Sequence, residues 1–268
     1  MHEHLIVAAI TFVVTLFGTV TNLLVIVCSR HMSSMNSSFG IITKSQAVCN
    51  IGMCSVFLWY VFPMQLSGSL SLLRFSHFFG TTAMSVDEVS NLSHLLIASN
   101  RFCAVFLASH YEHVFSKFGT KVMSNLIWIV SITFCVLLYE ILGCHLLYDE
   151  ASWTLIFVPT AQCTLLTWYS DFILNMSLVG TTMALNLITA FKAGRNSRML
   201  MNAAGVKMSK KQRQRELSFI RQTFFQGLTV FFGQITYYLV APLMRTPILL
   251  FFFSSLWAFV HAFEGSAF

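Results

Sequence analysis

Four residues with ionisable or hydrogen-bonding side chains lie close together in the sequence: Asp87, Glu88, Asn91 and His94. Asp87, Asn91 and His94 are spaced i, i+4 and i+7, so on a helix they share one face. Such a stripe can bind a small polar ligand or act as an activation switch, and it can equally form an interhelical hydrogen-bond cluster. Both interpretations stay open. Asp171 is a further ligand-contact candidate, although a position near a helix N-terminus favours a structural role for its carboxylate.

A positive charge separates two apolar runs a little further along the chain. Asn100-Arg101-Phe102 lies between "LLIAS" and "CAVFLAS", with no turn residue. An unpaired charge in a soluble core is costly, whereas at a membrane edge the guanidinium reaches water. At the centre of a membrane helix, Arg costs about 2.5–3.5 kcal/mol on insertion scales. The pattern therefore indicates that Arg101 lies at the inner end of a membrane helix.

The composition indicates a membrane protein throughout. Of 268 residues, 56% are hydrophobic and 10% are charged, whereas a soluble domain carries about 25% charged residues. Apolar runs of about 20 residues recur, long enough to cross a hydrocarbon core, and in lipid such runs must be helical. We predict an all-α membrane protein, a single domain over residues 1–268 that forms a seven-transmembrane helix bundle. The expected helices are 5–28, 40–62, 78–108, 121–147, 168–191, 218–240 and 247–268.

The distribution of Lys and Arg predicts the orientation of the bundle. With the N-terminus outside, the outer loops hold only Arg74 and Arg245, and the other basic residues fall in inner loops or near inner helix ends. This bias places the N-terminus outside and the C-terminus inside. The net charge of +6 then reflects topology and attraction to anionic inner-leaflet lipid, and no nucleic-acid partner is expected.

Two cysteines flank the second outer loop, on the oxidising side of the membrane: Cys144 and Cys163. We expect a disulfide between them, closing a loop of roughly 20 residues. His110 and His113 lack a convincing third ligand, so a solvated face is expected there, and neither a metal site nor another cofactor is predicted. The sequence contains no Walker-type loop, no G-x-S-x-G and no Cys-x-x-Cys pair, which argues against an enzyme.

Three phrases of the sequence resemble the nematode chemoreceptors called serpentine receptor class X. They are "NSSFGIITKSQAVCNIG" opening the second helix, "SHLLIASNRFCAVF" closing the third and "YSDF" opening the fifth. The resemblance implies a multi-pass protein of the cell membrane, with the sensory-neuron cilium as a candidate location. It implies a G-protein-coupled receptor that binds a small molecule in the outer half of the bundle. A heterotrimeric G protein would be activated through the inner ends of the third, fifth and sixth helices. Coupling is assigned to Asn100, Arg101 and Phe102.

The chain departs from that pattern in three respects, which leaves alternatives open. Rhodopsin-type receptors carry an acidic residue at the position of Asn100, and Asn cannot form an ionic lock with Arg101. No Cys stands near the outer start of the third helix, and the sequence stops at "HAFEGSAF" without the usual inner tail. A C-terminally truncated, non-signalling receptor is one alternative. A transporter or channel is the other, although no inverted repeat or matching pair of Gly/Pro-broken segments is present.

Overall fold

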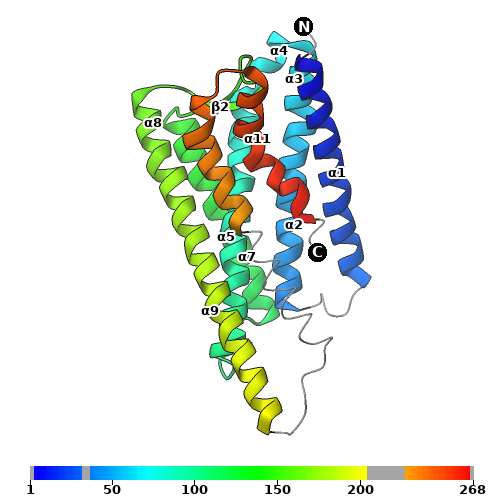
Figure 1. Ribbon diagram of the computed structural model, residues 1–268, viewed down its shortest axis with the longest axis vertical. Coiled ribbons are helices and arrows are strands. Elements are labelled where there is room, and N and C mark those ends of the chain that lie inside the picture. The colour runs from blue at the N-terminus through cyan, green and yellow to red at the C-terminus, as the bar shows by residue number, and fades with distance from the viewer. Residues whose placement is uncertain (1–2, 32–36, 204–226, 266–268) are drawn as a thin grey trace.

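Helices aligned along one long axis make up most of the protein (Figure 1). The computed structural model describes residues 3–31, 37–203 and 227–265. Several long helices continue through a wide π-helical turn (η2 to η5), and a short 3₁₀ turn ends one of them. The helical elements before the hairpin are α1 (Glu3–His31), α2 (Ser38–Val56), η2 (Phe57–Val61), α3 (Phe62–Ser67), α4 (Leu70–Leu73), α5 (Ser76–Phe106), α6 (Tyr111–Val114), α7 (Lys117–Cys135) and η3 (Val136–Ile141). Those after it are α8 (Ala161–Thr167), η4 (Trp168–Ile173), α9 (Leu174–Ala203), a helix at Gly227–Leu243 that contains η5 (Thr236–Val240) and η6 (Ala241–Leu243), and α11 (Pro247–Glu264).

Within the described residues, five helical segments are long and apolar enough to cross a membrane. They are Glu3–His31, Ser38–Ser67, Lys117–Ile141, Ala161–Arg195 and Pro247–Glu264. The helix at Gly227–Leu243 is apolar but shorter. Helix α5 has 31 residues, about 46 Å at 1.5 Å per residue. It is not among the five, because its many polar side chains lower its hydropathy.

The helices carry apolar side chains outward and polar side chains inward. Val13, Leu24 and Ile129 are more than half exposed, whereas Thr43 and Asn50 are almost fully buried. In water such a surface would be unstable, because exposed apolar area is unfavourable. In lipid it is favourable, and the inward polar groups must then find partners within the protein. The distribution of side chains is therefore that of a membrane-spanning bundle.

Helix α5 lies at the centre of the packing, in contact with α2, α7, α9 and the start of the hairpin. Its buried residues include Ser85, Asp87, Glu88 and Asn91. Polar and ionisable groups are expensive in lipid and are tolerated where they face a bundle interior. The central position of α5 therefore follows from its composition.

A two-stranded hairpin is the main departure from the expected all-α fold. Strand β1 (Leu146–Asp149) pairs antiparallel with β2 (Thr154–Phe157), with Leu146 opposite Phe157. The fourth helix was expected to continue to residue 147, and this is wrong. It ends at Ile141 and is followed by Gly143 in the left-handed region at φ 73°, a conformation that glycine adopts without strain. A short apolar run has the same hydropathy in a strand as in a helix, so composition alone cannot separate the two.

The hairpin is anchored to the helices around it at several points. Gly80 of α5 faces the backbone carbonyl of Leu146, leaving no room for a Cβ. The backbone N–H of Tyr148 donates to Ser76 Oγ at 2.5 Å, and Ser255 Oγ on α11 donates to Thr154 Oγ1 at 2.8 Å. The hairpin is thereby fixed against α5 and α11. We call this end of the bundle, at the top of Figure 1, the hairpin end, and the opposite end the Arg101 end.

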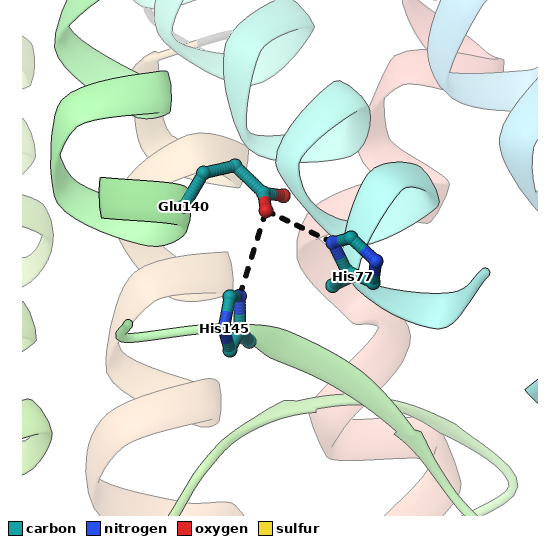
Figure 2. A group of neighbouring side chains, drawn as sticks. All are labelled: His77, Glu140 and His145. Atoms are coloured by element: carbon teal, nitrogen blue, oxygen red, sulfur yellow. Dashed lines mark hydrogen bonds and ion pairs between the residues drawn. The ribbon is translucent and has the colours of Figure 1, made fainter. Parts of the chain in front are cut away.

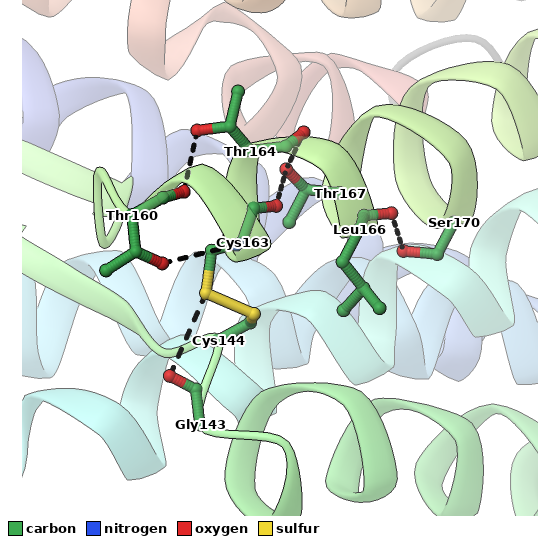
Figure 3. The surroundings of a disulfide bond; sticks show 8 residues. All are labelled: Gly143, Cys144, Thr160, Cys163, Thr164, Leu166, Thr167 and Ser170. Atoms are coloured by element: carbon green, nitrogen blue, oxygen red, sulfur yellow. Dashed lines mark hydrogen bonds between the residues drawn. A yellow bond between two sulfur atoms is a disulfide. The ribbon is translucent and has the colours of Figure 1, made fainter.

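A disulfide ties the hairpin to α8 (Figure 3). Cys144, just before β1, is bonded to Cys163, with Cα atoms 5.2 Å apart and a sequence separation of 19. Thr160 caps α8 by accepting a hydrogen bond from the Cys163 backbone N–H at 3.2 Å. The bond therefore joins the two ends of the segment that contains the hairpin.

Several helix bounds also differ from expectation. The third helix is shifted to 76–106, and the fifth helical segment is helical from 161 to 203 rather than 168–191. The fourth begins at Lys117, behind the capping side chain of Ser116. N-caps and polar first turns lie outside the apolar stretch from which the bounds were predicted. Of the expected sixth helix, residues 218–226 lie outside the described residues.

Two of the π-helical turns lie just before a proline. Turn η2 precedes Pro63, and η5 precedes Pro242. Proline lacks an N–H and its ring crowds the preceding turn, so local widening of the helix relieves both problems. Turns η3 and η4 have no such cause in the sequence. All four rotate the side chains that follow relative to a regular α-helix.

Removing the disulfide should loosen the hairpin. In the chain-entropy model a bridge over this loop is worth about 3 kcal/mol, so Cys144→Ser with Cys163→Ser should lower thermal stability in detergent. Mass spectrometry of non-reduced protein should show the Cys144 and Cys163 peptides linked. The matched control is Cys28→Ser, since Cys28 is an exposed free cysteine and its loss should change neither result. Alkylation of both Cys144 and Cys163 without reductant would contradict the bond.

Candidate functional site

Two cavities lie inside the bundle, one toward each end. A chamber lies beneath the hairpin, with about 260 Å³ of space between its atoms when the open solvent at its mouth is included. Its lining residues come from α5, both strands, η4, the Gly227–Leu243 helix and α11: Met84, Asp87, Leu146, Phe157, Asp171, Gln234, Tyr237 and Trp257. A larger cleft of about 530 Å³ lies toward the Arg101 end. We refer to them as the chamber and the cleft.

Asp171 is held in the chamber wall by hydrogen bonds on both carboxylate oxygens. Asn175 Nδ2, one helical turn later, donates to Oδ1 at 2.7 Å. The Tyr238 hydroxyl donates to Oδ2 at 2.5 Å. Asp171 is 5% exposed, and these donors stabilise a carboxylate that has lost its water. Asp171 lies on η4 and Tyr238 on η5, so two π-helical turns position this pair.

Two of the residues that line the chamber carry a buried polar atom without a hydrogen-bond partner among the described residues. These atoms are the side-chain oxygen Oε1 of Gln234 and the indole Nε1 of Trp257. A buried unpaired donor or acceptor costs roughly 1–3 kcal/mol, so each such group calls for a partner. One is an acceptor and the other a donor. Together with the Asp87 and Asp171 carboxyls they give the chamber a polar lining suited to a small polar molecule.

Asp87 and its neighbours form an interhelical hydrogen-bond network. Asp87 Oδ1 lies 3.0 Å from His261 Nε2 of α11, and His261 Nδ1 lies 2.9 Å from Asn50 Oδ1 of α2. Asn50 Nδ2 donates to Asn22 Oδ1 of α1 at 3.0 Å. Within α5, Asn91 Nδ2 donates to Asp87 Oδ2 at 3.0 Å. One continuous chain of polar contacts therefore joins α1, α2, α5 and α11.

The orientation of Asn50 limits the protonation states of this network. Since its Nδ2 donates to Asn22, its Oδ1 must accept from His261 Nδ1–H. His261 Nε2 then faces a carboxylate oxygen, and one proton lies between the two atoms. The Asp87–His261 contact is thus either an ion pair or a neutral pair with Asp87 as the donor.

His94 belongs to a second buried contact with α11. Its Nε2 lies 2.8 Å from Glu264 Oε1. Gln46 Nε2 of α2 donates to the other oxygen of Glu264 at 3.1 Å. Two rows of polar contacts thus fasten α11 to α2 and α5. His261 and Glu264 were missed by the sequence analysis, although an ionisable residue inside an apolar helix is a recognisable signal.

The structure divides the predicted ligand residues among different surroundings. Asp87 and Asp171 both line the chamber, whereas Asn91 and His94 line the cleft. Glu88 lines neither cavity; it is buried and interacts with Asn175 of α9. The sequence analysis also missed Gln234, although a polar residue inside a predicted apolar helix is a recognisable sign of a functional site. Tyr237 and Trp257 could not be recognised in this way, because aromatic residues are common throughout this chain.

The cleft lies between α2, α5, α9 and the start of the Gly227–Leu243 helix. Its lining includes Arg101, Ile97, Val179, Thr182, Asn186 and Val230. The Arg101 guanidinium lies over the Phe39 ring, with Cζ 5.1 Å from the ring centroid, a cation–π geometry. Of the Asn100-Arg101-Phe102 triplet, Arg101 alone lines the cleft.

The neighbours of Arg101 in the triplet contact α6 and the last turn of α5 itself. Asn100 is buried, and its Nδ2 donates to the Tyr111 hydroxyl of α6 at 3.2 Å. Phe102 stacks on Phe106, with ring centroids 4.5 Å apart. These contacts fix the last turns of α5 and thereby the base from which Arg101 extends.

Comparison with known proteins supports the resemblance found in the sequence. The family described as "Serpentine type 7TM GPCR chemoreceptor Srx" matches residues 12–268. The chain is 23% identical over 252 residues to Serpentine receptor class X 45 of Caenorhabditis elegans, covering 92% of this chain and 69% of that protein. It is 26% identical over 207 residues to Serpentine receptor class X-43 of the same organism, covering 76% of this chain.

The alignment with the second relative spans 62% of that protein's length, so the chain matches less than two thirds of it. The match to the family nevertheless extends across nearly the whole chain and includes every element that lines the chamber and the cleft. Apolar helices with an inward polar network agree with the membrane bundle that the family name describes. The chain belongs to the Srx family of serpentine, seven-transmembrane G-protein-coupled chemoreceptors.

Proposed function

We propose that this protein is a chemosensory receptor whose small-molecule ligand binds in the chamber and whose cleft receives a heterotrimeric G protein. The observation that carries the proposal is the chamber, which holds two carboxyl groups and two unpaired polar atoms beneath a disulfide-anchored hairpin. The fold suits this role, since ligand sites of helix bundles lie between their helices. Membership of a chemoreceptor family supports the same function.

The chamber favours a small ligand with a positive charge or several hydrogen-bond donors. Among the described residues, its lining contains Asp87 and Asp171 and neither Lys nor Arg. A cation near a carboxylate is attracted by roughly 4 kcal/mol at 4 Å for an effective dielectric of 20. The Gln234 oxygen offers an additional acceptor and the Trp257 indole a donor. In the conformation described, the chamber has room for about one water-sized molecule, so a ligand would have to be compact and would widen the chamber as it binds.

We further propose seven membrane-spanning helices, with the hairpin end outside the cell. In this arrangement α5 and the Gly227–Leu243 helix would cross together with the five apolar segments. Disulfides persist in oxidising compartments, which supports an outer location for Cys144 and Cys163. The excess of Lys and Arg in the opposite loops supports the same orientation. The N-terminus would then lie outside and the C-terminus inside.

Asp87 offers a physical link between the ligand site and the G-protein site. Its carboxyl group lines the chamber and accepts a hydrogen bond from Asn91, which lines the cleft. A ligand cation at Asp87 would compete with His261 and Asn91 for the same oxygens. The ligand would thereby shift an equilibrium between two arrangements of α5 and α11, and the altered cleft would admit the G protein.

The proposed orientation predicts the pattern of glycosylation. An acceptor sequence in a flexible insertion between Glu150 and Ala151, at the tip of the hairpin, should be glycosylated in cells. The same insertion at Gln212 should not be modified, because that part of the chain would lie in the cytoplasm. Insertion at both points in one chain controls for expression. Modification at Gln212 with none at the hairpin would reverse the orientation.

The chamber predicts that Asp171 contributes directly to ligand binding. For a compound found to activate the receptor, Asp171→Asn should lower potency about tenfold or more, because a contact to a charged group is worth roughly 1.5–3 kcal/mol. Glu150→Gln, which removes an exposed carboxylate at the hairpin tip, should change potency by no more than about twofold.

Tyr238→Phe separates a binding role of Asp171 from a structural one. It removes the hydroxyl that donates to Asp171 and leaves the carboxylate in place. Potency close to wild type in Tyr238→Phe, with a loss in Asp171→Asn, supports ligand contact. Unchanged potency in a well-expressed Asp171→Asn variant would contradict the chamber as the ligand site.

The cleft predicts that Arg101 acts in G-protein coupling. In lipid nanodiscs with a heterotrimeric G protein, an activating compound should stimulate nucleotide exchange. Arg101→Ala should reduce this exchange about tenfold or more, as expected for a lost charged contact. Compound affinity measured without the G protein should stay close to wild type. Arg101→Lys keeps the charge and loses the planar fork, so it should also couple poorly.

Arg30→Ala is the matched control, because Arg30 is an exposed basic residue in the last turn of α1. It should leave exchange unchanged. Normal coupling in both Arg101 variants would reduce Arg101 to a residue that sets topology. Solute or ion flux without nucleotide exchange would favour a transporter or channel instead.

A further inference from the structure

Two histidines and a glutamate meet at the hairpin end, outside the chamber (Figure 2). His77 lies in the first turn of α5, Glu140 on η3, and His145 in the segment between η3 and β1. Their nitrogen and oxygen atoms all lie within 4.8 Å of one another. Among the described residues, this is the one group of three or more His, Cys, Asp or Glu side chains with such spacing.

The three side chains point toward a common centre. Glu140 Oε2 lies 2.9 Å from His77 Nδ1 and 3.8 Å from His145 Nδ1, as Figure 2 shows. Ligands of a tetrahedral Zn²⁺ at about 2.0–2.1 Å are separated from one another by about 3.3 Å. To reach this value, the Glu140–His77 distance must increase and the Glu140–His145 distance must decrease, each by a few tenths of an ångström. The ligand nitrogens of His77 and His145, which lie within 4.8 Å of each other, must also approach this separation, so ion binding requires the side chains to rotate.

One atom of the cluster has an unmet bonding need. His145 Nδ1 is buried and has no hydrogen-bond partner among the described residues, although its lone pair or N–H faces the Glu140 carboxylate. His77 by contrast is already within hydrogen-bond distance of Glu140. A simple His77–Glu140 pair leaves His145 Nδ1, 3.8 Å from Glu140 Oε2, without a hydrogen bond. A cation bound to all three would satisfy His145 as well.

The surroundings of Glu140 resemble the supporting shell of a metal ligand. Its second oxygen, Oε1, accepts a hydrogen bond from Thr81 Oγ1 at 2.6 Å. Such an outer partner fixes the carboxylate and leaves the other oxygen directed at the metal. The side chains of His77, Glu140 and His145 are 30%, 22% and 33% exposed, so the cluster lies near the surface; His145 must turn for an ion to reach its buried Nδ1.

We propose that His77 Nδ1, His145 Nδ1 and Glu140 Oε2 bind a first-row transition cation, with Zn²⁺ as the fitting ion and water in the fourth position. Two neutral imidazoles and one carboxylate suit Zn²⁺. Ca²⁺ and Mg²⁺ require oxygen ligands and are excluded by the same set. The ion would join α5, η3 and the entry to β1, next to the Cys144–Cys163 bond. It would thus hold the hairpin by a second, reversible link.

The first test is Zn²⁺ binding to the full chain in nanodiscs, after removal of metal with a chelator. Competition with a chromophoric zinc indicator should show one site per chain that Mg²⁺ and Ca²⁺ do not occupy. Glu140→Gln, His77→Ala and His145→Ala should each weaken Zn²⁺ at least about tenfold, since loss of an outer partner alone costs 10–100-fold. The control is the double variant His110→Ala, His113→Ala at the Arg101 end, which should bind Zn²⁺ as the wild type does.

Glu140→Gln retains hydrogen-bonding capacity toward Thr81 and His77, so it is the variant most compatible with folding. Gel filtration and the Cys144–Cys163 link in mass spectrometry verify that each variant is folded. A second measurement needs no variant: X-ray absorption at the zinc edge of the wild type should show two imidazoles and oxygen ligands. Zinc affinity that Glu140→Gln leaves unchanged, sulfur in the first shell, or loss of binding in the His110/His113 variant would overturn the proposal.

Discussion

Polar groups inside a membrane bundle depend on partners within the protein, and the Asp87–His261 contact connects most of the helices that supply such partners here. Lipid offers no hydrogen bonds, so Asp87, His261, Asn50 and Asn22 bond to one another across four helices. The pairing places α5 at the centre and fixes α11 against α1 and α2. The close approach of Gly18 to Ala262 brings α1 and α11 near enough for these contacts. Packing and polar satisfaction therefore specify the same helix arrangement.

This same network connects the two cavities of the receptor. Asp87 lines the chamber, and Asn91, one turn later, lines the cleft. In the proposed function, a ligand at Asp87 would displace His261 or Asn91 and so shift α5 and α11 between two arrangements. A ligand bound in the chamber would thereby act on the cleft along a single helix, α5. The polar side chains that lower the hydropathy of α5 are thus also the ones on which the proposed signalling depends.

The hairpin end adds structure that the helices alone do not provide. The disulfide, the contact of Gly80 with Leu146 and the Ser255–Thr154 hydrogen bond fix the hairpin above the chamber. The proposed zinc ligands lie beside the hairpin and outside the chamber lining. Ligand binding in the chamber and metal binding beside it would thus be separate functions that both depend on the position of the hairpin.

The sequence by itself determined the membrane character, the polar stripe on one face of α5, the position of Arg101 near the end of that helix and the family. Each of these depends on composition, helical periodicity or a local phrase, which a linear sequence displays directly. It did not predict the hairpin, because an apolar strand and an apolar helix end have the same composition. Tertiary structure alone decided that Asp171 joins Asp87 in one chamber while Asn91 and His94 face the other cavity. Likewise His77 and Glu140, 63 residues apart, meet only because α5 packs against η3, and no local pattern encodes such a contact.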